Sequence, residues 1–93
     1  MNVNHKQDES KGAFIAEDNG KKAGEMTYSM AGTDKIIIDH TEVDPAFGGQ
    51  GVGKKMVLAA VDFAREKNIK ILPLCPFAKA TFDKNKDIQD VLF

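Results

Sequence analysis

The stretch of sequence that decides the fold reads Gly48-Gly49-Gln50-Gly51-Val52-Gly53-Lys54-Lys55. It holds four of the eight glycines in the 93-residue chain. The apolar run Ile36-Ile37-Ile38 precedes it, and a pattern of apolar residues at helical spacing follows it. A glycine-rich turn between a strand and a helix lets bare backbone approach a ligand, with several N–H groups at the positive end of the helix dipole. This arrangement predicts a site for a phosphate or pyrophosphate group.

The segments on either side of the glycines predict the rest of the fold. Apolar periodicity places strands at 12–17, 23–30, 35–43 and 69–74, and helices at 51–67 and 77–83. Asn19-Gly20 between the first two strands is a hairpin signal, because both central positions of such a turn need positive φ. The element order, strand, strand, strand, helix, strand, helix, indicates an α/β fold. We expect a mixed, mostly antiparallel sheet of about four strands with two helices.

Two helix ends carry chemical signals. Asn68 is a candidate C-terminal cap of the long helix, because asparagine tolerates the left-handed conformation that ends many helices. Pro76 favours the first position of the second helix and so places Cys75 at its N-cap. A thiol there faces the positive end of the helix dipole, which lowers its pKa and favours the thiolate. The alternative is that Cys75, like many lone cysteines, is a small buried hydrophobe.

The strand at 35–43 carries two candidate catalytic residues, His40 and Glu42, just before the glycines. Regular alternation would place both on the face that also carries the isoleucines at 36 and 38. They are either a catalytic pair or solvent-facing residues of the strand. In the preceding strand, Tyr28 alternates with apolar residues, so we expect it in the core; a role as general acid is the alternative.

Length and composition narrow the class of protein. A chain of 93 residues forms one small domain, shorter than a doubly wound nucleotide-binding domain. Its net charge of -1 gives no bulk attraction to nucleic acid or to an acidic membrane, so we expect neither as a partner. The single cysteine agrees with a reducing compartment, and neither a membrane span nor a signal peptide is visible, so we expect a cytoplasmic protein. We place the domain at 12–93, after a polar N-terminus at 1–11 that is flexible or extends a sheet edge. We expect no metal site.

Two common phosphate-binding motifs fit the glycines poorly. Gly48, Gly53 and Lys54 satisfy the G-x-x-x-x-G-K pattern of a Walker loop. Lys55, however, stands where Ser or Thr would hold Mg²⁺. A dinucleotide fingerprint, G-x-G-x-x-G, would need a third glycine where Met56 stands. A loop that is merely flexible would not need four glycines at a helix start.

The run from Val43 to Gly53 resembles motif A of the GNAT superfamily of acyl-CoA-dependent N-acetyltransferases. That motif reads Q/R-x-x-G-x-G/A, and the chain matches it at Gly51 and Gly53 but has Gly48 in place of the first Arg or Gln. In the superfamily, the amides of this loop hold the coenzyme A pyrophosphate at the helix N-terminus.

The resemblance extends to a small, single-domain GNAT-like family that carries a Cys-Pro-Phe or Cys-Pro-Tyr motif after the last core strand. It covers roughly residues 12 to 93. Two further segments carry it: His40-Thr41-Glu42-Val43 and Pro73-Leu74-Cys75-Pro76-Phe77-Ala78.

This resemblance implies a minimal GNAT-like fold, in which the strands at 35–43 and 69–74 splay apart and admit the pantetheine arm of acetyl-CoA. The strand before the loop would pair with that arm through its backbone. The residues that we expect to contact coenzyme A are Thr41, Val43, Gly48, Gly49, Gln50, Gly51, Val52, Gly53 and Lys54.

The resemblance also implies roles for the candidate catalytic residues. An amine acceptor must lose a proton before it attacks a thioester, and in the superfamily the strand before motif A commonly supplies the base, here Glu42 or His40. Cys75 would lie near the thioester, where it either accepts the acetyl group covalently or lines the pocket.

We therefore expect an acyl-CoA-dependent N-acetyltransferase that moves an acetyl group from acetyl-CoA to an amine acceptor, directly or through Cys75. Members of the small family lack the N-terminal helices that wall the acceptor pocket in full-length enzymes of the superfamily, so we expect an open acceptor site. Such a site fits a protein or peptide amine, or is completed by a second subunit. We expect a monomer or a weak homodimer. The alternative is a non-catalytic module that binds CoA, acyl-CoA or a partner protein.

Overall fold

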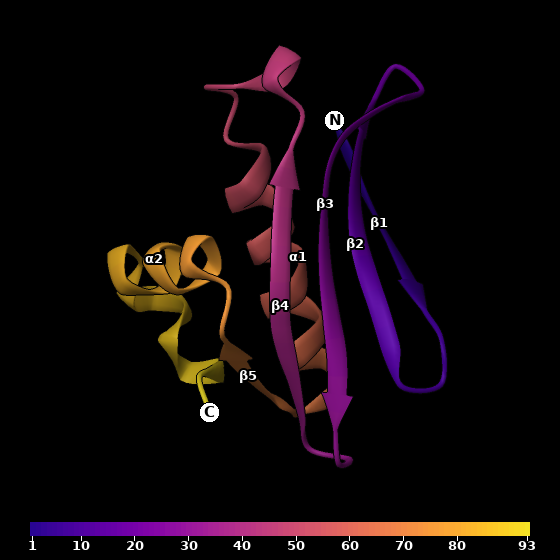
Figure 1. Ribbon diagram of the computed structural model, residues 1–93. Coiled ribbons are helices and arrows are strands. Elements are labelled where there is room, and N and C mark those ends of the chain that lie inside the picture. Colours follow the sequence, from indigo (N-terminus) through magenta and orange to yellow (C-terminus); the bar gives the residue numbers. More distant parts are fainter.

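Five strands form one sheet, and two α-helices pack against it (Figure 1). The computed structural model describes residues 1–93. The strands are β1 (Asn2–Gln7), β2 (Lys11–Asp18), β3 (Lys21–Ala31), β4 (Lys35–Val43) and β5 (Lys70–Pro73). The helices are α1 (Val52–Lys67) and α2 (Pro76–Lys84), and the 3₁₀ segments are η1 (Pro45–Phe47) and η2 (Lys86–Val91). The first four strands pair antiparallel in chain order, and β5 joins β4 in parallel through α1, which confirms the predicted α/β class and mixed sheet.

Strand β1 raises the strand count to five, where the sequence predicts about four. Its residues pair antiparallel with β2 from Asn2 to Gln7, so most of the N-terminal segment is an extension of the sheet edge rather than a flexible end. An edge strand needs few apolar side chains, which is why the polar composition hid it. On the face turned toward α1, His5 stacks on Phe14 with 4.3 Å between the ring centroids and contacts Phe63 edge-on.

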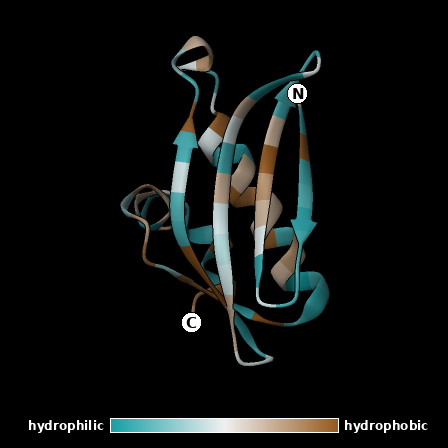
Figure 2. Cartoon of the chain, turned by 45° about the vertical axis from the view of Figure 1, so that its right-hand side comes forward, coloured by the Kyte–Doolittle hydropathy of each residue, from teal (hydrophilic) through white to brown (hydrophobic).

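Helix α1 lies behind the sheet, and both elements mix apolar and polar residues along their length (Figure 2). The buried residues of α1 recur at helical spacing: Val52, Gly53, Met56, Val57, Ala60, Val61 and Ala64. They share one core with inward-facing strand residues such as Phe14, Met26 and Ile38, and burial of a side chain of this size contributes ~1.5–3 kcal/mol. Asn68 ends the helix at a φ of 56°, as predicted. Neither α1 nor any other helix is long and apolar enough to cross a membrane.

A β-bulge interrupts the pairing of β3 with β4. Tyr28 on β3 lies opposite Ile38. The preceding residue, Thr27, lies opposite His40, which leaves Asp39 as an extra residue on β4. One extra residue reverses the faces of every residue that follows it in the strand.

The bulge moves the candidate catalytic residues to a different face from the one predicted. His40 and Glu42 lie on the open face of the sheet, whereas Ile38 faces the core, so the prediction of one shared face is wrong. Thr41 is turned the other way and lies opposite the buried Met26, on the side of α1. The bulge therefore gives β4 a polar outer face and places a hydroxyl on its inner face.

Strands β4 and β5 separate after a short parallel ladder. Their register ends where Ile38 lies opposite Pro73. The N–H groups of Leu74 and Cys75 then both donate to the Ile38 carbonyl at 3.0 Å. Beyond this point the chain turns into α2, and residues 39–43 of β4 have no strand on that side. This separation is the splay that the resemblance implies.

Candidate functional site

The glycine-rich loop connects β4 to α1 through the 3₁₀ turn η1. Asp44 caps this turn, since its carboxylate accepts a hydrogen bond from the Ala46 N–H at 2.9 Å. Gly49 and Gly51 have φ values of 80° and 70°, left-handed conformations that residues with a Cβ rarely adopt. Gly51 is the N-cap of α1, and no side chain caps the helix there. The N-terminus of α1 is therefore open at the loop.

Five backbone N–H groups of the loop and the first helical turn have no acceptor within the chain. They belong to Gly49, Gly51, Val52, Gly53 and Lys54. The helical ladder begins with the Lys55 N–H, which donates to the Gly51 carbonyl at 3.0 Å. The four donors from Gly51 to Lys54 are therefore the orphan donors of a helix start. Converging amides at a helix N-terminus attract an anion. We call these five amides the cradle.

Two residues predicted to contact coenzyme A have their amides occupied. The Gly48 N–H donates to the Pro45 carbonyl at 3.1 Å, and the Gln50 N–H donates to the Phe47 carbonyl at 3.4 Å. Both bonds lie in the turn that leads into the loop. They set the loop conformation. The backbone donors that remain for a ligand are those of the cradle.

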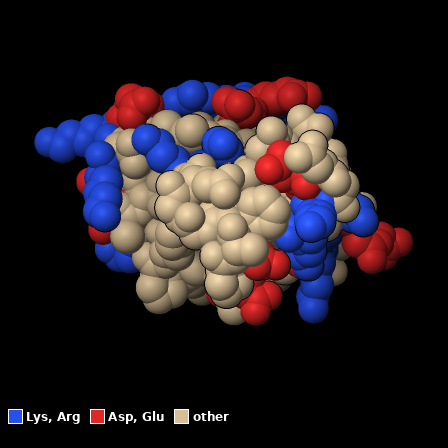
Figure 3. Space-filling view, turned by 90° about the horizontal axis from the view of Figure 1, so that it is seen from above, with Lys and Arg blue, Asp and Glu red and all other residues tan.

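A shallow cleft lies over the cradle. Its apolar lining comes from Val43, Val52, Phe47 and, at the start of α2, Phe77. Phe77 is 44% exposed and lies so close to Gly53 that a Cβ at position 53 would overlap its ring. Seen from this end, the molecule has a broad uncharged surface with Lys and Arg side chains on both sides of it (Figure 3).

The edge of β4 beside the cradle has backbone groups without a strand partner. The Asp44 N–H donates to the Ala23 carbonyl at 2.8 Å, toward β3. Because backbone groups alternate in direction along a strand, those of Thr41 and Val43 point the other way, into the splay. An extended chain in the splay would find donors and acceptors there.

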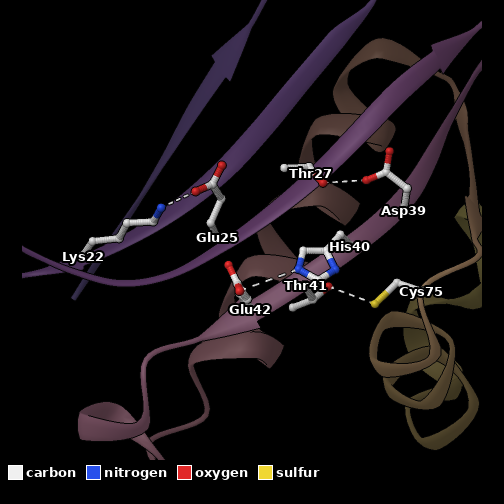
Figure 4. Close-up of polar contacts among 8 residues, drawn as sticks. All are labelled: Lys22, Glu25, Thr27, Asp39, His40, Thr41, Glu42 and Cys75. Atoms are coloured by element: carbon white, nitrogen blue, oxygen red, sulfur yellow. Dashed lines mark hydrogen bonds and ion pairs between the residues drawn. The ribbon is translucent and has the colours of Figure 1, made fainter.

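Cys75 lies across the splay from this edge, as the N-cap of α2 that the sequence predicts (Figure 4). It is 6% exposed, and its Sγ lies 3.3 Å from the hydroxyl of Thr41. Burial works to raise the pKa of the thiol. Hydrogen bonds from the Thr41 hydroxyl and from the backbone N–H groups of Ala78, Phe77 and Thr41 outweigh it, so the pKa lies below its ordinary value. These hydrogen bonds therefore favour the thiolate of Cys75.

His40 and Glu42 lie on the open face and are both well exposed (Figure 4). Their side chains are 65% and 76% exposed, with His40 Nε2 4.0 Å from Glu42 Oε1. Neither hydrogen-bonds to Cys75, whose side-chain partner is Thr41. The structure therefore brings together two pairs, His40 with Glu42 and Thr41 with Cys75, on opposite faces of one strand.

A second cleft on the open face runs between the ends of β3 and β4. Its lining includes Glu42, Glu25 and Lys22, the last two joined as an ion pair. Val43 lines both this cleft and the one over the cradle. The two clefts therefore meet at the end of β4, so groups bound in them would approach each other there.

Tyr28 belongs to the core and not to either cleft. It is 1% exposed, and its hydroxyl lies 2.5 Å from Nε2 of His5. Burial raises the pKa of this phenol. Tyr28 is thus the core residue that its alternation indicates, and its hydroxyl is engaged by β1.

Sequence reasoning missed the side chains of Thr41 and Phe77. Thr41 is predicted only as a backbone contact, because regular alternation places its side chain on the face opposite to that of the buried isoleucines. Phe77 approaches Gly53 across 24 residues of sequence, and no local pattern reports such a contact. The one signal in the sequence is a glycine, Gly53, inside the helix predicted at 51–67.

A family model described as GCN5-related N-acetyl-transferase matches residues 13–91. Protein NATD1 of Xenopus tropicalis is 32% identical over 60 residues, which make up 64% of this chain and 55% of NATD1. NATD1 of Homo sapiens is 30% identical over 60 residues. The chain spans about half the length of the curated relatives it matches.

Solved structures share the fold. The solution structure of a GCN5-like protein from Staphylococcus aureus is 42% identical with a TM-score of 0.72, and the match covers 99% of this chain and 89% of that one. A Clostridium acetobutylicum protein solved with acetyl-CoA has a TM-score of 0.63 at 22% identity, over 80% of this chain and 55% of that one. The second likeness shows the fold alone.

Proposed function

Because the chain belongs to the GCN5-related N-acetyltransferase family, we propose that it transfers an acetyl group from acetyl-CoA to an amine acceptor. The observation that carries the proposal is the cradle, five amides without acceptors at the N-terminus of α1. Such a row of donors at an open helix N-terminus suits the pyrophosphate of coenzyme A. The match of the family model over residues 13–91 supports the same donor.

The donor would lie along the splay. The cradle would hold the pyrophosphate, with Lys54 beside it. The edge of β4 would pair with the pantetheine arm through the Thr41 carbonyl and the backbone of Val43, because the Thr41 N–H is directed to the sulfur of Cys75. Acetyl-CoA, when bound, supplies the acetyl group as a thioester. Residues with Cβ atoms at 49 and 51 would disturb the loop, which explains why glycine stands there.

Cys75 is the nucleophile in the route that we propose. Its thiolate attacks the thioester carbonyl, a new S–C bond forms, and the coenzyme sulfur leaves with the electron pair of the broken bond. The acceptor nitrogen then attacks the carbonyl held on Cys75 and releases the cysteine thiolate. Two observations support attack by Cys75 before attack by the amine. The pKa of Cys75 is lowered, and its thiol lies in the splay.

Glu42 or His40 would take the proton that the amine must lose. Both lie on the open face. Glu42 lines the cleft there, next to Val43 where the two clefts meet, whereas His40 lines neither cleft. The proton taken from the nitrogen would pass to the coenzyme thiolate released in the first step, so that the products are the amide and the CoA thiol and Cys75 returns to its thiolate. No helix lies in front of this face in Figure 1, which suits a protein or peptide amine as acceptor.

Binding of the donor is tested with two matched glycine variants. Gly49 and Gly20 have φ values of 80° and 79°, and a Cβ at either position would meet nothing within 4 Å. Gly49→Ala and Gly20→Ala therefore carry a similar backbone strain, but only the first lies in the cradle. We expect CoA to raise the melting temperature of the wild type and of Gly20→Ala, and to do so less for Gly49→Ala. Equal responses of the two variants would contradict the cradle as the CoA site.

Turnover is tested by mass spectrometry of the intact protein and of a pool of amine acceptors after incubation with acetyl-CoA. We expect acetylated acceptor, and acetylated wild type but not acetylated Cys75→Ser when the acceptor is left out. Full turnover by Cys75→Ser would establish direct transfer instead. Stabilisation by CoA with no acetylated product would favour a non-catalytic binding module, and no stabilisation by CoA would exclude both functions.

A further inference from the structure

We propose that Thr41 is a positioning residue for Cys75: its hydroxyl holds the sulfur at the splay and donates a hydrogen bond to the thiolate. The inference rests on the proposed function, because it concerns the same thiol. In this proposal the thiolate of Cys75 is stabilised by a hydroxyl on the inner face of β4, and not by a histidine.

The register of the sheet carries this assignment. The extra residue Asp39 turns the side chain of Thr41 inward, opposite Met26. From there its Oγ1 reaches the sulfur of Cys75 at 3.3 Å, across the gap where β4 and β5 have separated. The same bulge turns His40 outward, so the one imidazole near the splay is directed away from the thiol (Figure 4).

The surroundings of the sulfur leave few other side chains to act on it. From β4, His40 engages Glu42, and from α2, Lys79 engages Asp83 at 3.4 Å. The groups that favour the thiolate of Cys75 are the Thr41 hydroxyl and nearby backbone amides, none of them charged. A side-chain substitution leaves the backbone amides in place. The Thr41 hydroxyl is therefore the hydrogen-bond donor that a substitution can remove.

The hydroxyl can serve both forms of the cysteine. It accepts from the neutral thiol and donates to the thiolate after the hydroxyl proton rotates. A hydrogen bond to a charged group is stronger than one to a neutral group, so the net effect favours ionisation. Loss of this bond is expected to lower the thiolate fraction at neutral pH by about tenfold.

The test titrates the thiol itself, using the ultraviolet absorbance of the thiolate and the rate of alkylation by iodoacetamide. The chain has one cysteine, so both signals report Cys75 alone. Thr41→Val keeps the branched shape that suits a strand and removes the hydroxyl, and Thr41→Ser keeps the hydroxyl. Thr27→Val makes the same change on the open face, where its hydroxyl bonds to Asp39 at 2.5 Å.

We expect the titration of Thr41→Val to move to higher pH by about one unit, with Thr41→Ser and Thr27→Val close to the wild type. In turnover, Thr41→Val should lower kcat more than it changes KM for acetyl-CoA. A titration unchanged in Thr41→Val, or one moved by His40→Asn instead, would overturn the proposal. Because the titration needs neither donor nor turnover, a protein that fails to bind CoA would contradict the proposed function and leave this measurement valid.

Discussion

The first half of strand β4 is paired on both edges, whereas the second half is paired on one. Residues 35–38 lie between β3 and β5, and the side chains of Ile36 and Ile38 are fully buried. Residues 39–43 have only β3 as a neighbouring strand, carry polar side chains up to Glu42 and lead through η1 to the cradle. One strand thus serves as core over one half and as a binding edge over the other, with the bulge at Asp39 between them.

The difference teaches that stability and chemistry can be assigned to separate segments of the same strand. Substitutions in the first half should change folding and spare the chemistry of each folded molecule. Substitutions in the second half should do the opposite.

The largest effect is expected at the outer face of the second half. If Glu42 is the base, Glu42→Gln lowers kcat/KM by about 10²–10⁴ and removes the ionisation from the pH–rate profile; His40→Asn tests the other candidate in the same way. Both residues are exposed, so urea unfolding should show changes within about 0.5 kcal/mol. A pH–rate profile that neither variant alters would exclude both as the base.

The next effect concerns the first half. Ile36→Ala removes a fully buried side chain from the core and should lower the free energy of unfolding by about 2–5 kcal/mol, measured by urea denaturation. The further stabilisation by CoA should match that of the wild type at the same ligand concentration, because the folded site is unchanged. A loss of CoA binding by the folded variant would show that the two halves are not independent.

Helix α1 could gain about 1 kcal/mol of helix propensity from Gly53→Ala, yet the Cβ would overlap the ring of Phe77. We expect Phe77 to be displaced and CoA affinity to fall by about tenfold, the equivalent of one hydrogen bond. Titration calorimetry measures the affinity. The double variant Gly53→Ala, Phe77→Leu should recover part of the lost CoA affinity. If the losses of the two single variants add up in the double variant, the two residues act independently.

The smallest effect lies at the far edge of the sheet. Burial lowers the pKa of His5 below its ordinary value of 6.5, so the folded state favours the neutral ring. The unfolded chain then binds more protons as the pH falls below 6.5, and this part of the stability is lost toward acid. Urea denaturation above and below that pH should show a slightly steeper loss for the wild type than for His5→Gln. Identical slopes would mean that β1 does not depend on the neutral ring.

The parts of the fold that follow from local chemistry could be predicted from the sequence. Asn19 and Gly20 both have positive φ in the hairpin, Asn68 caps α1, and Cys75 caps α2. Asn19, Gly20 and Asn68 themselves tolerate positive φ, and Pro76 after Cys75 favours the first position of a helix.

The parts that depend on pairing between strands could not be predicted. The bulge at Asp39 arises from the register of β3 against β4, and nothing in the residues around it marks the extra position. It alone decides which of these two neighbours faces the core, so that Thr41 is turned inward and His40 outward. Strand β1 escaped prediction for a related reason, since its stability comes from the edge of β2 and from contacts of His5 with Phe14.

The most direct test of the two-half description is an NMR titration of the backbone amides with CoA. We predict shifts at the cradle amides and at Thr41 and Val43, with little change at Ile36 and Ile37 in the paired half of the strand. Shifts confined to other surfaces, or of equal size in both halves of β4, would contradict the assignment of the donor to the unpaired half.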